Sequence, residues 1–183
     1  MLLCFSLFAQ SPASLDKEKL FDLYQSQKYG DAAAYLKSVY GDDNNDFKVI
    51  TQIGYCYSMS GNTAEAEKLY TKANLLQPQS IPVLFSLASV SSRRGKTEKA
   101  KSYYEEIIKL DSNNFTAYKQ LAGLHPEAFS IQKLKLLRLA NKLNPTDADI
   151  AFDISDMYMK MNMFGLVDSI IKPALVVDST NIQ

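Results

Sequence analysis

The sequence has little of what catalysis usually needs. Its 183 residues include no tryptophan, one histidine and two cysteines. His125 is followed directly by a proline and has no recognisable partner for acid–base chemistry, so we interpret it as a loop or helix-end residue. No glycine-rich phosphate-binding loop is present. These absences argue against an enzyme and indicate no cofactor.

An excess of charge of either sign is also missing. The chain has 20 lysines and arginines against 20 aspartates and glutamates, and the two signs are interleaved. Nucleic-acid binding needs a basic surface that displaces counterions from phosphates, so we expect no nucleic-acid partner. Apart from the start of the chain there is no long apolar run, and a membrane span would need about 20 such residues.

The first 12 residues resemble a truncated export signal. Residues 1–9 (MLLCFSLFA) are apolar apart from Ser6, end on a small residue and are followed by Pro12. The pattern favours a secretory signal over a short disordered leader, although a positively charged start is absent. We therefore expect an exported bacterial protein, periplasmic or associated with the cell envelope, or a cytoplasmic one if this leader is not a signal.

Removal of such a leader would take Cys4 with it and leave Cys56 as the one cysteine. A lone thiol cannot form an intramolecular disulfide, and one cysteine with one histidine is too few for a structural zinc site. No activating base is recognisable near Cys56 in the sequence, so we expect a small buried residue rather than a nucleophile.

An acidic loop at residues 41–46 partly matches a calcium-binding motif. Asp42, Asn44 and Asp46 have the alternating spacing of the first ligands in an EF-hand loop. Phe47, however, replaces the required turn glycine, and Ile53 stands where the bidentate glutamate belongs. The match fails, and the segment is better interpreted as a solvated loop that ends in a helix cap.

Residues that favour helix starts recur at a nearly constant interval of 34, 34, 33 and 34 positions. They are Asp46, Ser80, Asn114, Asp147 and Asn181. Further turn signals lie midway, at residues 61–63, 94–97 and 126–130. Each period therefore predicts a helix, a tight turn and a second helix, and a fixed period of this length indicates a solenoid.

Small and aromatic residues recur in the same register. Gly54 with Ala66, and likewise Ala88 with Ala100, would let two antiparallel helices approach closely. Tyr70 and Tyr104, one period apart, would then wedge between neighbouring hairpins.

The segment Phe47–Pro78 resembles the tetratricopeptide repeat family. The matching positions are Phe47, Ile50, Ile53, Gly54, Tyr57, Ala66, Tyr70, Ala73 and Pro78. The resemblance implies an all-α, right-handed α-solenoid of about five helix-turn-helix units. They span residues 13–46, 47–80, 81–114, 115–147 and 148–181, and residues 182–183 would start a further unit.

Three units match this pattern less closely. Leu20 takes the small position of the first unit, and Ser155 and Val167 take the small pair of the fifth. The fourth unit is one residue shorter than the others. We place the missing residue beside Pro126, where the first helix of this unit should end early. The second helix of the fifth unit is strongly apolar where a solenoid usually ends in a polar cap, which indicates either a fragment of a longer protein or a covering partner.

In this family the first helix of each unit lines a concave groove, and the resemblance implies ligand contacts at fixed positions. In this sequence they fall on Lys17, Phe21, Tyr24, Lys48, Thr51, Tyr55, Ser58, Pro82, Phe85, Ser89, Ser92, Lys119, Phe152, Asp156 and Met159. Aromatic anchors and hydroxyls suit an extended peptide or a helix. The family's carboxylate clamp is not matched, because Phe21 stands where asparagine is needed. Packing against adjacent units is an equally strong interpretation for Phe85 and Phe152.

We therefore expect a non-catalytic scaffold that binds a protein or peptide in its concave groove, without metal or cofactor. The alternative is a spacer or self-assembly segment of a larger protein whose missing C-terminal part carries the activity. Neither the partner nor the oligomeric state can be predicted from the repeat pattern.

Overall fold

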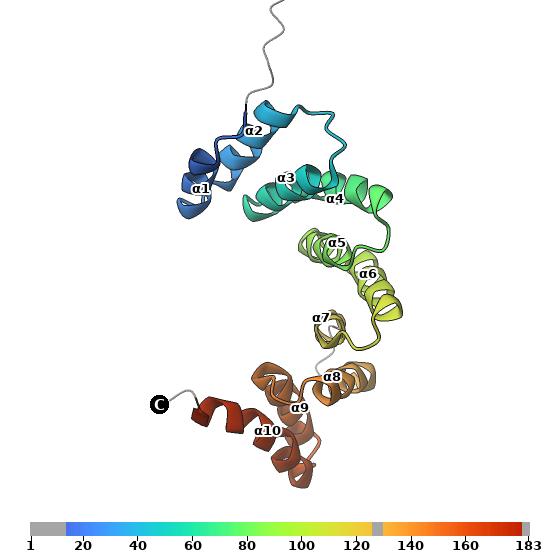
Figure 1. Cartoon of the computed structure of the whole chain (residues 1–183). Coiled ribbons are helices and arrows are strands. Elements are labelled where there is room, and N and C mark those ends of the chain that lie inside the picture. The colour runs from blue at the N-terminus through green and yellow to red at the C-terminus, as the bar shows by residue number, and fades with distance from the viewer. Residues whose placement is uncertain (1–13, 126–129, 181–183) are drawn as a thin grey trace, which may run out of the picture. The chain divides into compact units, whose positions relative to one another are not determined.

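The computed structural model describes residues 14–125 and 130–180, the last five of these by their backbone alone. The described residues form α-helices and one 3-10 turn, Phe164–Leu166, without a strand (Figure 1). The helices are α1 (Lys17–Gln25), α2 (Tyr29–Tyr40), α3 (Phe47–Met59), α4 (Thr63–Leu76), α5 (Ile81–Arg93), α6 (Thr97–Leu110), α7 (Phe115–Gly123), α8 (Ile131–Leu143), α9 (Ala148–Lys160) and α10 (Val167–Thr180). The all-α prediction is confirmed. The predicted leader, Pro126 and Asn181 lie outside the described residues, so export stays a prediction.

The helices pack as consecutive pairs, and the chain divides into two compact units. The first unit ends at Ser86 and the second begins at Leu87, so the division falls within α5. In the first unit α1 packs on α2, α2 on α3, and α3 on α4. In the second unit α7 packs on α8, α8 on α9, and α9 on α10. No helix among the described residues combines the length and apolarity needed to cross a bilayer.

The helix starts follow the predicted period, with one correction. The second helices α2, α4, α6 and α8 begin 34 residues apart, whereas the first helices α7 and α9 begin 33 apart. The missing residue therefore lies after the start of α8, and its placement beside Pro126 was wrong. α8 has 13 residues where α4 and α6 have 14. It ends before Asn144-Pro145, where the proline disfavours helical geometry at the residue preceding it.

Three of the predicted N-caps are confirmed by their side-chain hydrogen bonds. Asp46 accepts from the backbone N–H groups of Lys48 and Val49, at 2.8 and 3.0 Å. Asn114 accepts from the N–H of the third helical residue of α7 at 3.1 Å, and Asp147 does the same for α9 at 3.0 Å. Each cap satisfies a helix-start donor that would otherwise lack a partner, which is why these residues mark the starts so well.

The core of the first unit rests on the predicted small pair. Ala66 is fully buried on α4, and Gly54 is buried opposite it on α3. A Cβ atom placed on Gly54 would lie 3.0–3.3 Å from three ring carbons of Tyr70, whose side chain is only 4% exposed. The ring thus packs on the helix backbone of its own hairpin, a contact that the predicted wedge between hairpins did not include.

The second unit has its own core, formed by α7–α10. Its fully buried side chains include Ala122, Ala140 and Ile154. Ser155, which takes the predicted small position of the last hairpin, is buried, and its hydroxyl has no hydrogen-bond partner among the described residues. Pro173 lies inside α10, where it removes one backbone hydrogen bond from the helix.

Candidate functional site

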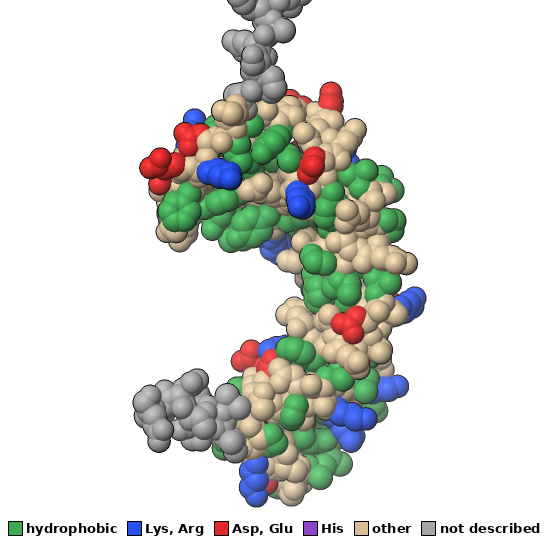
Figure 2. Space-filling view, in the orientation of Figure 1, with side chains coloured by type: hydrophobic (Ala, Val, Ile, Leu, Met, Phe, Trp, Pro, Cys, Tyr) green, Lys and Arg blue, Asp and Glu red, His purple; other side chains and the backbone are tan. Residues whose placement is uncertain are grey.

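Two predicted groove residues, Tyr24 of α1 and Tyr55 of α3, are joined into one group of rings by Tyr29 of α2. The ring of Tyr24 lies 6.1 Å from that of Tyr29, and Tyr29 meets Tyr55 edge-on at 6.0 Å, both measured between centroids. Phe21 precedes Tyr24 by three residues on α1 and therefore shares its helix face. These four residues are hereafter the aromatic cluster. Figure 2 shows hydrophobic side chains gathered over this part of α1 and α3.

The aromatic cluster has a fixed base and an accessible surface. The Tyr24 hydroxyl accepts a hydrogen bond from Gln52 Nε2 at 3.1 Å and lies 3.4 Å from Cys56 Sγ. Burial raises the pKa of Tyr24, so its hydroxyl stays protonated. Phe21 and Tyr55 are instead 59% and 46% exposed. Two large rings therefore face solvent above a tyrosine that is held in place.

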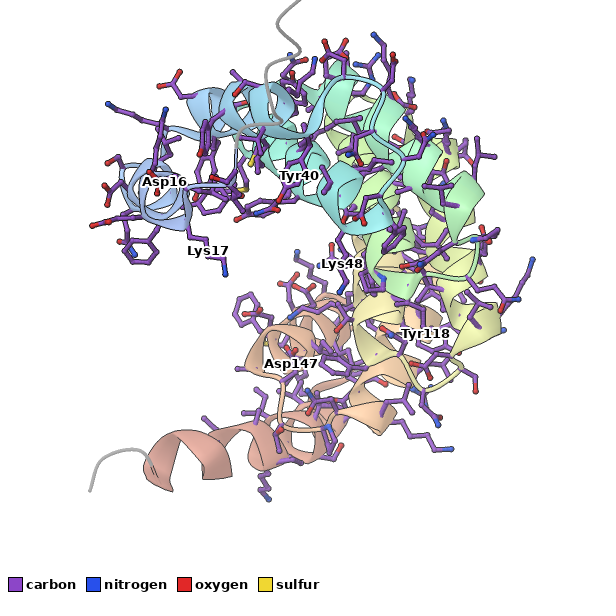
Figure 3. The ribbon with its side chains drawn as sticks, turned by 45° about the horizontal axis from the view of Figure 1, so that its top comes forward. Asp16, Lys17, Tyr40, Lys48, Tyr118 and Asp147 are labelled. Atoms are coloured by element: carbon purple, nitrogen blue, oxygen red, sulfur yellow. The ribbon has the colours of Figure 1, made fainter. Side chains whose placement is uncertain are left out.

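Polar groups lie next to the aromatic cluster on the same helices. Lys17 is one helical turn before Phe21, and Lys48 lies seven residues before Tyr55 on α3, so both share a face with the rings. Figure 3 shows the two lysines at the first turns of α1 and α3, and both are exposed. Neither has an acidic partner among the residues that the structure describes. Thr51 donates its hydroxyl to the Phe47 carbonyl oxygen at 2.9 Å.

Tyr29 is the member of the aromatic cluster that sequence reasoning missed. It begins α2, a second helix, whereas the family pattern places ligand contacts on first helices only. The one signal in the sequence is an aromatic residue directly after the turn that joins α1 to α2.

Cys56 is fully buried on α3 at the base of the aromatic cluster. Burial raises the pKa of its thiol, which outweighs the hydrogen bond with Tyr24. Reactive cysteines need the opposite, an accessible thiol with a lowered pKa. The interpretation of Cys56 as a small buried residue is confirmed.

Side chains of the acidic loop hold the loop itself. Asp42 pairs with Lys37 at 2.7 Å. Asn44 donates to the Tyr40 carbonyl oxygen at 3.2 Å, and its own side-chain oxygen accepts from the N–H of Asp46 at 2.7 Å. The oxygens that an EF-hand would direct at calcium are thus used for a turn and a cap.

The predicted groove residues of α5 and Ser58 of α3 differ in how far they are exposed. Phe85, Ser92 and Ser58 are half-buried, and Pro82 and Ser89 are exposed. Their ligand contacts stay predictions.

Lys119 of α7 has a structural role that the groove pattern did not foresee. Its ammonium group lies 3.0 Å from Asp147 and 2.9 Å from Asp149, and so ties α7 to the first turn of α9. Burial alone would lower the pKa of Lys119, but hydrogen bonds to the two aspartates raise it. Burial would likewise raise the pKa of Asp147. The hydrogen bonds that its carboxylate accepts from the backbone N–H of Ile150 and from the ammonium group of Lys119 lower that pKa instead.

The predicted groove residues of α9 are accessible. Phe152 and Met159 are 69% and 44% exposed, and Asp156 pairs with Lys160 at 2.6 Å. Phe152 is thus largely exposed within the described part of the chain, and its role in ligand binding stays a prediction.

Comparisons with known proteins agree with the repeat pattern. Two family models, both described as tetratricopeptide repeat, match residues 23–90 and 81–114, and together they span half of the chain. Superkiller complex protein 3 of Homo sapiens is 32% identical over 98 residues, 54% of this chain and 6% of its own length. The TPR repeat-containing protein MJ1428 of Methanocaldococcus jannaschii is 32% identical over 111 residues, 60% of this chain and 18% of its own length. The chain therefore spans less than a fifth of either relative.

Solved structures show the same fold. A crystal structure of MamA has a TM-score of 0.75 at 16% identity, covering 92% of this chain and 98% of that one. MamA from Desulfovibrio magneticus RS-1 has a TM-score of 0.72 at 14% identity, covering 91% and 94%. Repeats of this kind generally serve as scaffolds that bind proteins or peptides. By its helix pattern, its caps and the matched family models, the chain belongs to the tetratricopeptide repeat family.

Proposed function

We propose that the chain is a non-catalytic scaffold whose aromatic cluster binds an extended peptide or a helix from a partner protein. The observation that carries the proposal is the exposure of Phe21 and Tyr55 above the fixed Tyr24. Full burial of an aromatic side chain contributes about 1.5–3 kcal/mol, and exposed rings in a group are typical anchors of protein interfaces. A partner that covers both rings would bury the apolar surface that they expose in the free chain, and this burial would favour binding.

The residues next to the rings define the expected ligand. A bulky apolar side chain would pack against Phe21 and Tyr55. An acidic residue nearby in the ligand would meet Lys17 and Lys48, whose charges are not paired with acids among the described residues. We therefore expect peptides with one or two large apolar residues flanked by aspartate or glutamate.

Selection from a random peptide display library on the full chain tests this proposal. The dissociation constants of selected peptides would be measured by fluorescence anisotropy for wild type and for the double variant Phe21→Ala/Tyr55→Ala. Because truncation of two interface anchors costs about 1.5–4 kcal/mol, we expect binding to weaken by roughly 10- to 1,000-fold.

Phe164→Ala is the matched control. Phe164 is 63% exposed, similar to Phe21, but lies in the second unit, so its truncation should leave the affinity unchanged. Circular dichroism would check that each variant keeps its helices. Equal affinities of wild type and the double variant would show that the aromatic cluster is not the binding surface.

A second candidate function, self-assembly or stacking on another domain, is favoured by a different observation. Phe164, Leu166 and Leu175 are 63%, 45% and 60% exposed at the last hairpin. Light scattering at increasing concentration would show association that Phe164→Asp/Leu175→Asp abolishes. A monomer at all concentrations would count against self-assembly.

A further inference from the structure

A groove runs along α8 in the second unit, on a second helix and away from the first-helix positions considered above. It has a volume of about 630 Å³, within the range of roughly 300–1,000 Å³ that is usual for binding pockets. Its apolar lining comes from Ile131, Leu134 and Leu139 of α8 and from Ile170 of α10. Ile131 is 84% exposed and Leu139 38%, so the groove is open to a partner.

Basic residues border this apolar lining. Lys135, Arg138 and Lys142 are spaced by three and four residues, so they form one row along α8. All three are exposed, and none pairs with an acid among the described residues. Figure 2 shows basic side chains over this helix. The chain as a whole has no net charge, so the row is a local positive excess.

One polar group in the lining lacks a partner. Asn141 lines the groove, and its Oδ1 atom is buried and has no hydrogen-bond partner within the described part of the chain. Asn74, at the corresponding position of α4, has the same buried oxygen without a partner, so this feature belongs to the repeat and does not by itself indicate a ligand.

We propose that this groove binds an amphipathic helix of a partner protein, with acidic residues along one edge of the helix's apolar face. A helix lying beside α8 would place its apolar side chains on Ile131, Leu139 and Ile170, as in other helix-in-groove complexes. Carboxylates at three- and four-residue spacing would face the basic row. An anionic membrane suits this surface less well, because Leu134 and Ile170 of the apolar lining are half-buried within the groove, where side chains of a helix reach more readily than a bilayer surface does. The proposal does not depend on the aromatic cluster, which belongs to the first unit.

A designed peptide pair tests the proposal directly on the full chain. Both peptides are helical, of about 18 residues, with leucines on one face. One carries glutamates along the edge of that face, and the other carries lysines at the same positions. We expect saturable binding of the glutamate peptide by fluorescence anisotropy, at least about tenfold tighter than that of the lysine peptide. Its affinity should fall between about 50 and 300 mM salt, because exposed charge pairs are screened.

Substitutions in the groove then test whether the glutamate peptide binds there. Arg138→Glu/Lys142→Glu should weaken the glutamate peptide by at least about tenfold, and Leu139→Glu should do the same by removing apolar contact. Lys109→Glu is the matched control, because Lys109 is exposed on α6 and does not line the groove. Circular dichroism would confirm that the variants remain folded.

Several results would overturn the proposal. They are an absence of saturable binding, equal affinity for the two peptides, and binding that the groove variants leave unchanged. Binding to phosphatidylserine vesicles instead of peptide, lost in the same variants, would identify a membrane site. Self-association lost in Leu139→Glu would identify a second copy as the occupant. The glutamate peptide also fits the ligand expected of the aromatic cluster, so these measurements are made in the Phe21→Ala/Tyr55→Ala background. Binding that persists there and is lost in the groove variants separates this proposal from the proposed function.

Discussion

Replacement of Gly54 with alanine tests how closely α3 and α4 approach each other. The added Cβ atom would lie 3.0, 3.2 and 3.3 Å from three carbons of the Tyr70 ring. Favourable carbon–carbon contacts are about 3.5–4.0 Å, so the ring or the helix must shift by several tenths of an ångström. Tyr70 is only 4% exposed and therefore cannot move into solvent.

Two opposing effects set the magnitude of this change. Alanine is favoured over glycine within a helix by about 1 kcal/mol. Overpacking of a buried contact costs about 1–3 kcal/mol. We therefore expect Gly54→Ala to lower the free energy of unfolding by up to about 2 kcal/mol, against the direction that helix propensity alone predicts.

Urea denaturation followed by circular dichroism would measure the effect. Gly30→Ala is the matched control, because a Cβ atom there meets only Ser60 Cβ at an ordinary 3.9 Å, and we expect stabilisation of up to about 1 kcal/mol. In a Tyr70→Leu background the Gly54→Ala change should become favourable, since the ring is gone. If Gly54→Ala stabilises wild type as much as Gly30→Ala does, the close approach of α3 and α4 is refuted.

Three further predictions concern an ion pair, a thiol and a cap. The pKa of Asp147 is lowered in the folded chain. Its interactions with Lys119 and the start of α9 therefore stabilise the fold fully at pH values above the unfolded-state pKa of about 3.8. This stabilisation is lost as the pH falls through the folded-state pKa. Asp147→Asn keeps the cap but removes the ion pair, so denaturation between about pH 3 and 7 should show a flatter acid dependence; an unchanged profile would argue against the pair. In a Cys4→Ser chain, Cys56 should react with Ellman's reagent only after unfolding, because it is buried with a raised thiol pKa, and rapid reaction of the native chain would contradict this. Asp46→Ala should cost about 1 kcal/mol of unfolding free energy and Asp46→Asn much less, whereas equal losses would show that the side-chain cap contributes little.

The helix starts could be predicted because capping is a local property. Asp46, Asn114 and Asp147 each satisfy backbone donors two or three residues away, so their effect depends on nothing distant in the chain. The close approach at Gly54 could also be foreseen, since only a small residue permits it. The missing residue of the fourth repeat was misplaced because Pro126 is a conspicuous break, whereas Pro145 merely ends α8 one residue early.

Long-range pairing could not be predicted in the same way. Lys119 meets aspartates 28 and 30 residues away, and this contact follows from how α7 packs near the start of α9. A pattern that assigns one role to each repeat position cannot show whether a lysine there is paired. Tyr29 and the groove along α8 were missed for a related reason, because both belong to second helices and the family pattern places its ligand contacts on first helices.

Amide chemical shifts of the full chain, recorded as a library-selected peptide is added, would test the binding role of the aromatic cluster most directly. If the peptide binds the aromatic cluster, the largest changes in chemical shift should fall in Lys17–Gln25 and Phe47–Met59, together with Tyr29 at the start of α2. Shifts confined to α4 or to the second unit, with these segments unchanged, would contradict a peptide-binding surface at the aromatic cluster.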